Sequence, residues 1–189
     1  MGILRPNDAL DQLKQGNERF LSTRALRPGA VGPRREMLAQ EQRPFAIILS
    51  CSDSRVPPEI VFDTRLGDLF VVRVAGNVAN LSSIASVEYA VSQIGSQLVL
   101  VMGHERCGAV AATIAGGDGG KHLNHLMSYI HPAVGSDGDD LDRVARRNTQ
   151  LSAKRLLDQS EIIRTAIDDG NLKIATAFFH FADGRVEFD

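Results

Sequence analysis

The sequence contains no tryptophan, and aromatic residues make up 5% of its 189 residues. It has no apolar run close to the roughly 20 residues that a membrane-spanning helix needs. Its first residues turn polar at once, so a signal-peptide core is missing. The net charge of −2 gives no electrostatic attraction to nucleic acid or to an anionic membrane surface. These absences predict a soluble, cytoplasmic protein with no nucleic-acid or membrane partner.

Cysteine is also scarce, because Cys51 and Cys107 are the only two. A single disulfide has little purpose in a chain of this length without a secretion signal, so a disulfide framework is disfavoured. Free cysteine is commonly buried as an inert thiol. Composition alone therefore leaves inert thiols, a disulfide and metal ligands open, and the neighbouring residues must decide.

Apolar periodicity predicts an α/β chain. Short continuous apolar runs, typical of strands buried on both faces, lie at 45–49, 69–74 and 97–102. Helical spacing occurs at 8–22, 34–42, 82–93, 109–115, 122–134 and 139–169. The segments 172–180 and 185–188 are typical of a terminal hairpin or edge pair. Strands that alternate with helices indicate a parallel sheet with right-handed crossovers.

The chain shows no internal repeat, no low-complexity segment and no linker between two cores. Its length suits one core better than two. We therefore expect a single domain over 1–189, with an N-terminal helical arm at 1–43 and an α/β core at 44–189. Residues 23–33 predict a Pro/Gly-rich connector within the arm.

Chemically reactive side chains follow two of the predicted buried strands. The segment SCSDSRVP comes directly after the first strand, and GHERCG comes after the third. Ligands bind at the carboxyl ends of strands in an open parallel sheet, so Cys51, His104 and Cys107 converge if these strands are neighbours. Zn²⁺ prefers thiolate and imidazole ligands, and three protein ligands leave the open position of a catalytic site. Spacing alone also permits inert thiols or a Cys51–Cys107 disulfide.

Zinc at this edge would lower the pKa of a bound water from roughly 16 to about 7, giving a hydroxide suited to a small electrophile such as carbon dioxide. Asp53 and Arg55 lie two residues apart in the loop after the first strand. Arg55 keeps the carboxylate ionised. It also decides whether Asp53 orients the hydroxide or rotates in as a fourth ligand.

The motifs CSDSRVPPE and GHERCGAV, with GDLFVVRVAGN between them, resemble those of the β-class carbonic anhydrases. The resemblance extends from about residue 7 to the end of the chain. It implies an α/β fold with a mainly parallel four-stranded sheet, a fifth edge strand, flanking helices, and N-terminal helices that pack on a partner subunit. It also implies a homodimer or homotetramer. The activity implied is reversible hydration of carbon dioxide to bicarbonate and a proton by attack of zinc-bound hydroxide.

The resemblance also implies roles for individual residues. Cys51, His104 and Cys107 match the family's zinc ligands. Asp53 and Arg55 match its catalytic dyad. Four further positions match residues of the substrate pocket, namely Gln42, Phe70, Tyr89 and Gly108. The two aromatic residues among these would reach the pocket across a dimer interface.

A second subgroup of the family binds bicarbonate at a non-catalytic site while the aspartate closes onto zinc. That site needs a tryptophan three residues before the first cysteine, and this chain has Ile48 there. Arg73 matches the arginine of the same site. Because the tryptophan is missing, we predict the open, water-bearing, plant-type site without the bicarbonate switch.

Other signals receive no assigned role. Glu105 is expected to point to solvent or to pair with Arg106. Three histidines lie close together in the sequence and are expected at the surface or an interface, where one could relay a proton; they are His122, His125 and His131.

Two alternative functions stay open. The same zinc site could hydrolyse carbonyl sulfide or carbon disulfide, because the ligands would be identical and the pocket walls would decide. A non-catalytic zinc protein could keep the fold for structure or partner binding. The intact Asp53 and Arg55 argue against that second alternative.

Overall fold

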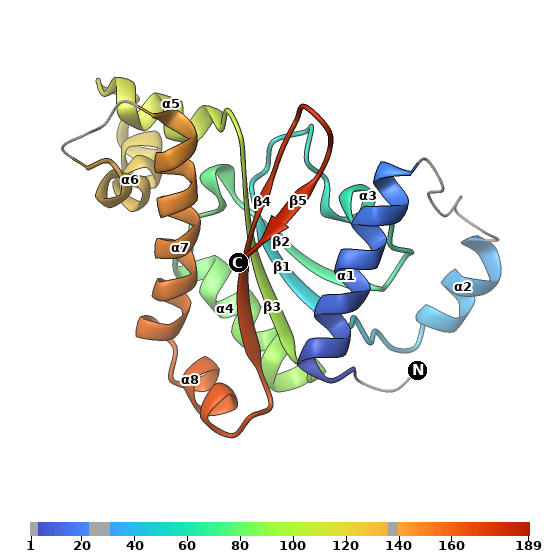
Figure 1. Ribbon diagram of the computed structural model, residues 1–189. Coiled ribbons are helices and arrows are strands. Elements are labelled where there is room, and N and C mark those ends of the chain that lie inside the picture. The colour runs from blue at the N-terminus through green and yellow to red at the C-terminus, as the bar shows by residue number, and fades with distance from the viewer. Residues whose placement is uncertain (1–3, 23–30, 136–139) are drawn as a thin grey trace.

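The computed structural model describes residues 4–22, 31–135 and 140–189, which form a five-stranded sheet between helical layers (Figure 1). The strands are β1 (Ala46–Ser50), β2 (Leu69–Arg73), β3 (Leu98–His104), β4 (Lys173–Phe179) and β5 (Val186–Phe188). Their order is β2-β1-β3-β4-β5, with β5 antiparallel to β4 and every other pair parallel. The predicted fold class, including the fifth edge strand and the terminal hairpin, is confirmed.

Helices cover both faces of this sheet (Figure 1). One face carries α1 (Pro6–Leu21) and α3 (Pro58–Val61), and the other carries α4 (Leu81–Tyr89), α7 (Leu141–Gln159) and α8 (Glu161–Asp168). The remaining helices are α2 (Val31–Leu38), α5 (Gly108–Ala115) and α6 (Lys121–Ile130). Short helical turns lie at Ala75–Asn77, Ala90–Ile94 and His131–Ala133. Both α5 and α6 follow the carboxyl end of β3.

The central strands are apolar throughout because both of their faces are buried. Side chains alternate between faces along a strand. Ala46 and Ile48 of β1 pack in the cluster beneath α1, whereas Ile47 and Leu49 pack in the cluster beneath α4 and α7. The continuous apolar run of β1 is therefore the expected sequence of a central parallel strand.

Some predicted boundaries are wrong. The helix predicted at 34–42 is α2, which begins at Val31 and ends at Leu38, while residues 23–30 of the predicted connector lie outside the described residues. The helix predicted at 139–169 is two helices, because the Ser160 side chain accepts a hydrogen bond from the Ile163 N–H and starts α8 anew. The short helix α3 was not predicted at all.

Helix α1 packs against the sheet of its own chain, with Ala9, Leu10 and Leu13 buried. Gly16 permits this approach, since a Cβ there would lie 1.9 Å from the Phe62 carbonyl oxygen. Packing of the N-terminal helices on a partner subunit stays a prediction, as does the division into an arm and a core.

A membrane-crossing helix is absent from the described residues, since none of their helices is both long and apolar enough. The cytoplasmic location stays a prediction.

Candidate metal centre

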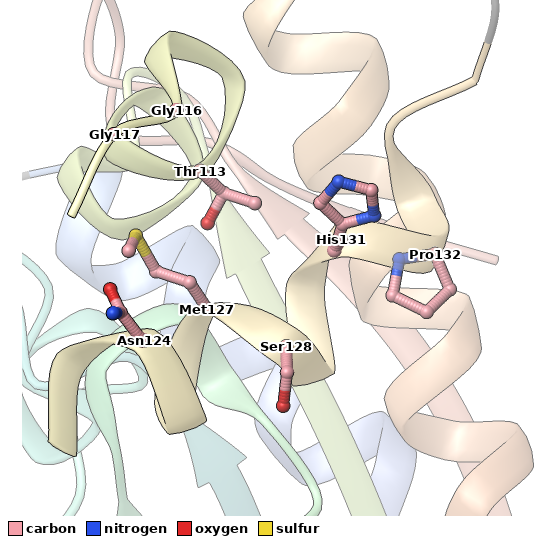
Figure 2. A pocket seen from close by; sticks show the side chains of 8 residues that line it. All are labelled: Thr113, Gly116, Gly117, Asn124, Met127, Ser128, His131 and Pro132. Carbon is pink, nitrogen blue, oxygen red and sulfur yellow. The ribbon is translucent and has the colours of Figure 1, made fainter. Parts of the chain in front are cut away.

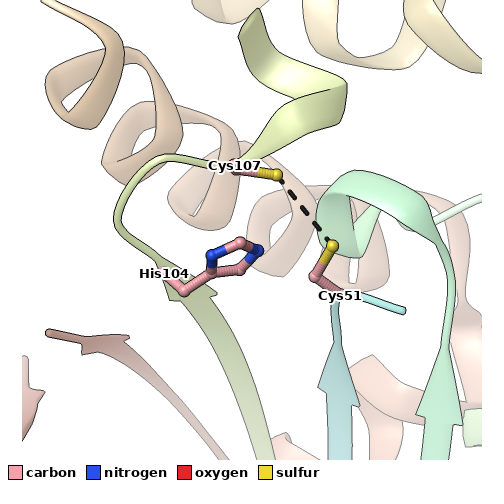
Figure 3. Close-up of side chains that lie close together, drawn as sticks. All are labelled: Cys51, His104 and Cys107. Atoms are coloured by element: carbon pink, nitrogen blue, oxygen red, sulfur yellow. Dashed lines mark hydrogen bonds between the residues drawn. The ribbon is translucent and has the colours of Figure 1, made fainter. Parts of the chain in front are cut away.

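Cys51, His104 and Cys107 meet at the carboxyl end of the sheet (Figure 3). Strands β1 and β3 are parallel neighbours, as the sequence argument required, so Cys51, which follows β1, lies beside His104, which ends β3. The candidate ligand atoms of the three side chains all lie within 4.8 Å of one another. All three residues are buried, and the cluster is enclosed by apolar side chains that include Val78 and Val110.

The histidine presents a lone pair to the two sulfurs. His104 Nδ1 lies 2.7 Å from the Glu105 backbone carbonyl oxygen. A carbonyl oxygen can only accept, so Nδ1 carries the proton and Nε2 is left unprotonated. His104 Nε2 is buried and has no hydrogen-bond partner among the described residues. An orphaned buried acceptor with a fixed tautomer is the usual state of an imidazole that ligates a metal.

The two thiols are close but not bonded. Their sulfurs lie 3.9 Å apart, whereas a disulfide bond is about 2.05 Å long. The hydrogen bond from Cys107 lowers the pKa of the Cys51 thiol, and the Gly76 N–H adds a contact to the Cys51 sulfur at 3.3 Å. Sharing that same hydrogen bond raises the pKa of Cys107. The contacts around Cys51 thus favour its thiolate form, and two cysteine sulfurs with one imidazole are a donor set that fits Zn²⁺.

Asp53 and Arg55 form a bidentate ion pair beside the cluster. Arg55 Nε donates to Asp53 Oδ1 at 2.9 Å and Nη2 donates to Oδ2 at 2.7 Å. These hydrogen bonds hold the pKa of the Asp53 carboxyl at about 2, so it is ionised at neutral pH. Asp53 Oδ2 lies 4.0 Å from His104 Nε2. The predicted dyad is thus within reach of the space that the three ligands face.

Arg73 at the end of β2 ties down the loop that carries Cys51. Its Nε donates to the Cys51 carbonyl oxygen at 2.9 Å, and its Nη2 donates to the Asp53 carbonyl oxygen at 2.6 Å. Both contacts are to backbone atoms of the first motif. In this structure Arg73 positions the loop that carries Cys51 and Asp53.

The residues matched to the substrate pocket divide into two groups. Gly108 follows Cys107 directly and begins α5. Gln42 precedes β1 while Cys51 follows it, and a five-residue strand spans about 16 Å. Phe70 contacts Tyr89, with ring centroids 6.3 Å apart, and lies opposite Ile47 near the start of β1. Within one chain, only Gly108 of these four lies at the cluster.

The expectation for Glu105 is wrong. Its carboxylate neither points freely to solvent nor pairs with Arg106; Oε1 lies 2.7 Å from His180 Nδ1, and Oε2 accepts the Phe181 N–H at 2.8 Å. The Phe181 N–H, followed by His180, holds the pKa of Glu105 below its ordinary value. His180 and Phe181 were missed, although they lie at the end of the segment predicted as a strand at 172–180, and β4 itself ends at Phe179.

A separate hollow of about 490 Å³ lies between α5, α6 and the turn that follows α6 (Figure 2). Eight residues line it, among them one imidazole, that of His131, while Asn124 and Ser128 add polar atoms. His122 and His125 are exposed on the same helix. This hollow does not gather a set of ligands or a nucleophile with a base, so the cysteine–histidine cluster is the candidate site.

Comparison with known proteins points to one family. A family model described as carbonic anhydrase matches residues 46–186, which include the whole cluster. A carbonic anhydrase of Mycolicibacterium smegmatis is 36% identical to this chain, covering 96% of it and 92% of the relative. Carbonic anhydrase 2 of Mycobacterium tuberculosis is 38% identical, with coverage of 95% and 91%.

Solved structures agree on the fold. One of two tetrameric beta-carbonic anhydrases from Sordaria macrospora matches with a TM-score of 0.76 at 24% identity, covering 96% of each chain. A Coccomyxa beta-carbonic anhydrase in complex with acetazolamide matches with a TM-score of 0.75 at 23% identity, covering 95% of this chain and 85% of that one. At these identities the likeness is evidence for the fold.

Proposed function

Because this chain belongs to the β-class carbonic anhydrase family, its reaction is the reversible hydration of carbon dioxide, and we propose that Cys51, His104 and Cys107 hold the zinc ion for it. The observation that carries the assignment is the buried lone pair of His104 Nε2, which has no partner among the described residues and faces two thiols. Zn²⁺ held there would supply the Lewis acidity that makes water a nucleophile near neutral pH.

Asp53 and Arg55 act together on the reacting water. The Asp53 carboxylate is ionised and partly exposed, so it can accept a hydrogen bond from that water and orient a lone pair toward carbon dioxide. Arg55 occupies both carboxylate oxygens and so fixes the direction in which Asp53 points. The Gly108 N–H, at the start of α5, is a donor for the product oxygen.

We further propose that the site is of the open, plant-type subgroup. The bidentate ion pair with Arg55 opposes rotation of the Asp53 side chain toward the proposed zinc ligands. Ile48 replaces the tryptophan anchor of the bicarbonate site and is fully buried in the sheet. Arg73, the matching arginine, is engaged with the backbone of the Cys51 loop. A crystal structure of the zinc-loaded protein at neutral pH is expected to show the Asp53 carboxylate hydrogen-bonded to Arg55. Coordination of zinc by Asp53 would contradict the proposal.

A homodimer or homotetramer would complete the pocket. The edge strand β2 is partly exposed along its length although four of its five residues are apolar, and Tyr89 beside it is 51% exposed. Strand β2, Tyr89 and Gln42 lie away from the cysteine–histidine cluster of their own chain. A partner subunit would cover them and could bring the matched aromatic residues to the opposite site.

The test is stopped-flow hydration of carbon dioxide by protein whose zinc content has been measured. Hydration that depends on zinc supports the proposal, and zinc-loaded protein without hydration contradicts it. Parallel assays with carbonyl sulfide and carbon disulfide test the sulfur analogues. Faster turnover of either analogue than of carbon dioxide would replace the proposed substrate while retaining the zinc site.

A further inference from the structure

The loop between His104 and Cys107 adopts a backbone conformation that needs outside support. Arg106 has a φ of +48°, in the left-handed region that residues with a side chain seldom occupy. Such a conformation persists where surrounding contacts determine it. The Arg106 N–H donates to Asp142 Oδ1 at 2.8 Å, which supplies one of these contacts.

Arg55 Nη2 donates to the Arg106 carbonyl oxygen at 3.4 Å, and the side chain of Glu105 adds a third support by attaching the loop to the end of β4. Its two carboxylate oxygens are both engaged, one by His180 Nδ1 at 2.7 Å and the other by the Phe181 N–H at 2.8 Å. The Glu105 N–H also donates to the Phe179 carbonyl oxygen at 3.1 Å, which extends the pairing of β3 with β4. A residue between two metal ligands is thereby attached to a different strand.

His180 is held from its other side as well. Its Nε2 lies 3.1 Å from Glu187 Oε2 on β5, and Arg146 of α7 donates to the same oxygen at 2.7 Å. The Arg146 guanidinium in turn lies over the Phe178 ring, 4.1 Å from its centroid. With both ring nitrogens engaged, the imidazole has one orientation, and it presents Nδ1 to Glu105.

Phe181 connects this anchor to the reactive residues. The Arg55 guanidinium lies over the Phe181 ring at 4.2 Å from its centroid, a cation–π geometry. The same ring meets His104 edge to face, with centroids 5.7 Å apart and an interplanar angle of 76°. One phenylalanine therefore contacts both a proposed metal ligand and the arginine that holds Asp53.

We propose that Glu105 and His180 are a positioning pair that holds Phe181 in place, and that the Phe181 ring fixes Arg55, and through it Asp53, relative to the metal ligands. The inference rests on the proposed function of the cluster. Glu105, His180 and Phe181 do not touch the reacting atoms, so they act through His104 and Arg55.

Substitution of Phe181 tests the ring alone, because the backbone N–H that Glu105 binds stays in place. Phe181→Leu is expected to lower kcat and kcat/KM together by about 10-fold, since small misplacements of catalytic groups have effects of this size or larger. Phe181→Tyr keeps the aromatic face and is expected to restore turnover. Zinc content should stay that of the wild type in both. Equal turnover in the two variants, whether fast or slow, would overturn the role of the ring.

A double-mutant cycle tests the pair. Glu105→Ala and His180→Ala are each expected to lower kcat about 10-fold, and the double variant no further, because residues that act as a unit are not additive. The control is Asp158→Asn, which removes an exposed carboxylate paired with Lys154 on α7 and should leave kcat unchanged. Additive losses, or wild-type turnover in Glu105→Ala, would overturn the proposal.

A spectroscopic readout separates this inference from the proposed function. The visible absorption of cobalt(II)-loaded protein reports ligand geometry without any turnover. It is expected to shift in Glu105→Ala and to match the wild type in Asp158→Asn. An unchanged spectrum in Glu105→Ala overturns the positioning role even if the wild type hydrates carbon dioxide. A shifted spectrum in a protein that does not hydrate carbon dioxide retains the positioning role and overturns the function.

Discussion

Arg73, the last residue of β2, donates its Nε hydrogen to the backbone carbonyl oxygen of Cys51 at 2.9 Å. An arginine on β2 thus fixes the loop at the end of the neighbouring strand β1. That loop carries the proposed zinc ligand Cys51 and the aspartate of the dyad, Asp53. Because the contact is to a backbone oxygen, it holds the loop whether or not the Cys51 side chain binds a metal ion.

Loss of the Arg73 contact should increase the rate at which the site releases zinc. In Arg73→Lys, one ammonium group cannot reproduce both carbonyl contacts, and we expect zinc to pass to a chelator about 10-fold faster, as when outer contacts to metal ligands are removed. The matched control is Arg164→Lys, because Arg164 also binds two carbonyl oxygens, those of Leu157 and Asp158, far along the chain from the cluster. Equal release rates in the two variants would contradict the role of Arg73.

The dyad aspartate should matter for turnover and not for metal binding. Asp53→Asn removes the charge that orients water while keeping the size of the side chain. We expect kcat to fall about 100-fold, the lower range of general acid–base effects, with zinc content unchanged. Stopped-flow hydration alongside metal analysis measures both. Turnover at the wild-type rate would remove Asp53 from the mechanism.

Helix α1 should be sensitive to a single methyl group. Gly16→Ala places a Cβ 1.9 Å from the Phe62 carbonyl oxygen, so the helix must move outward, and we expect a loss of about 1–3 kcal/mol in the free energy of unfolding. Gly108→Ala is the matched control for stability, because its Cβ would meet nothing within 4 Å. Urea denaturation compares them. Equal stability would mean that α1 does not need this close contact.

The Glu187 ion pair should give a pH-dependent contribution to stability. Arg146, followed by His180, holds the pKa of Glu187 below its ordinary value. A lowered folded-state pKa adds stability above the unfolded-state pKa of about 4.3, and that stability is lost as pH falls through the folded value. Glu187→Gln should therefore cost about 0.5 kcal/mol at pH 7, since Glu187 is 41% exposed, and nothing at acid pH. A cost that persists below pH 3 would contradict this origin.

The proposed oligomer should depend on the β2 edge. Tyr89→Asp puts a charge beside Phe70 on the surface that a partner would cover, so we expect the solution mass to fall to that of one chain and turnover to fall with it. Leu123→Asp is the control, because Leu123 is 44% exposed on α6, away from this edge. Light scattering after gel filtration gives the mass. An unchanged mass in Tyr89→Asp would place the interface elsewhere.

The sequence allowed prediction of the strands and of the proposed ligands for a physical reason. Strands buried on both faces have continuous apolar runs, and reactive side chains in a parallel sheet gather at the carboxyl ends. Cys51 and His104 each follow such a run, so their convergence required only that β1 and β3 be neighbours, which they are. The dyad follows Cys51 in sequence and was therefore placed with it.

The contacts that support the site could not be predicted in this way. His180 is 75 residues from Glu105, and only the register of β4 on β3 brings them together. Glu105 lies in a motif where surface exposure was the simplest expectation. The division of the long helix at Ser160 depends on one side-chain cap, and the approach of Gly16 to Phe62 depends on packing that a sequence pattern does not encode.

The most direct test of the account is the rate of carbon dioxide hydration by one protein sample measured before chelation, after chelation, and after zinc is added back. The account predicts one zinc ion per chain, hydration that disappears when zinc is removed and returns with it, and neither zinc nor hydration in Cys107→Ser. Hydration that survives complete removal of zinc, or a fully loaded chain that is no faster than buffer, would contradict it.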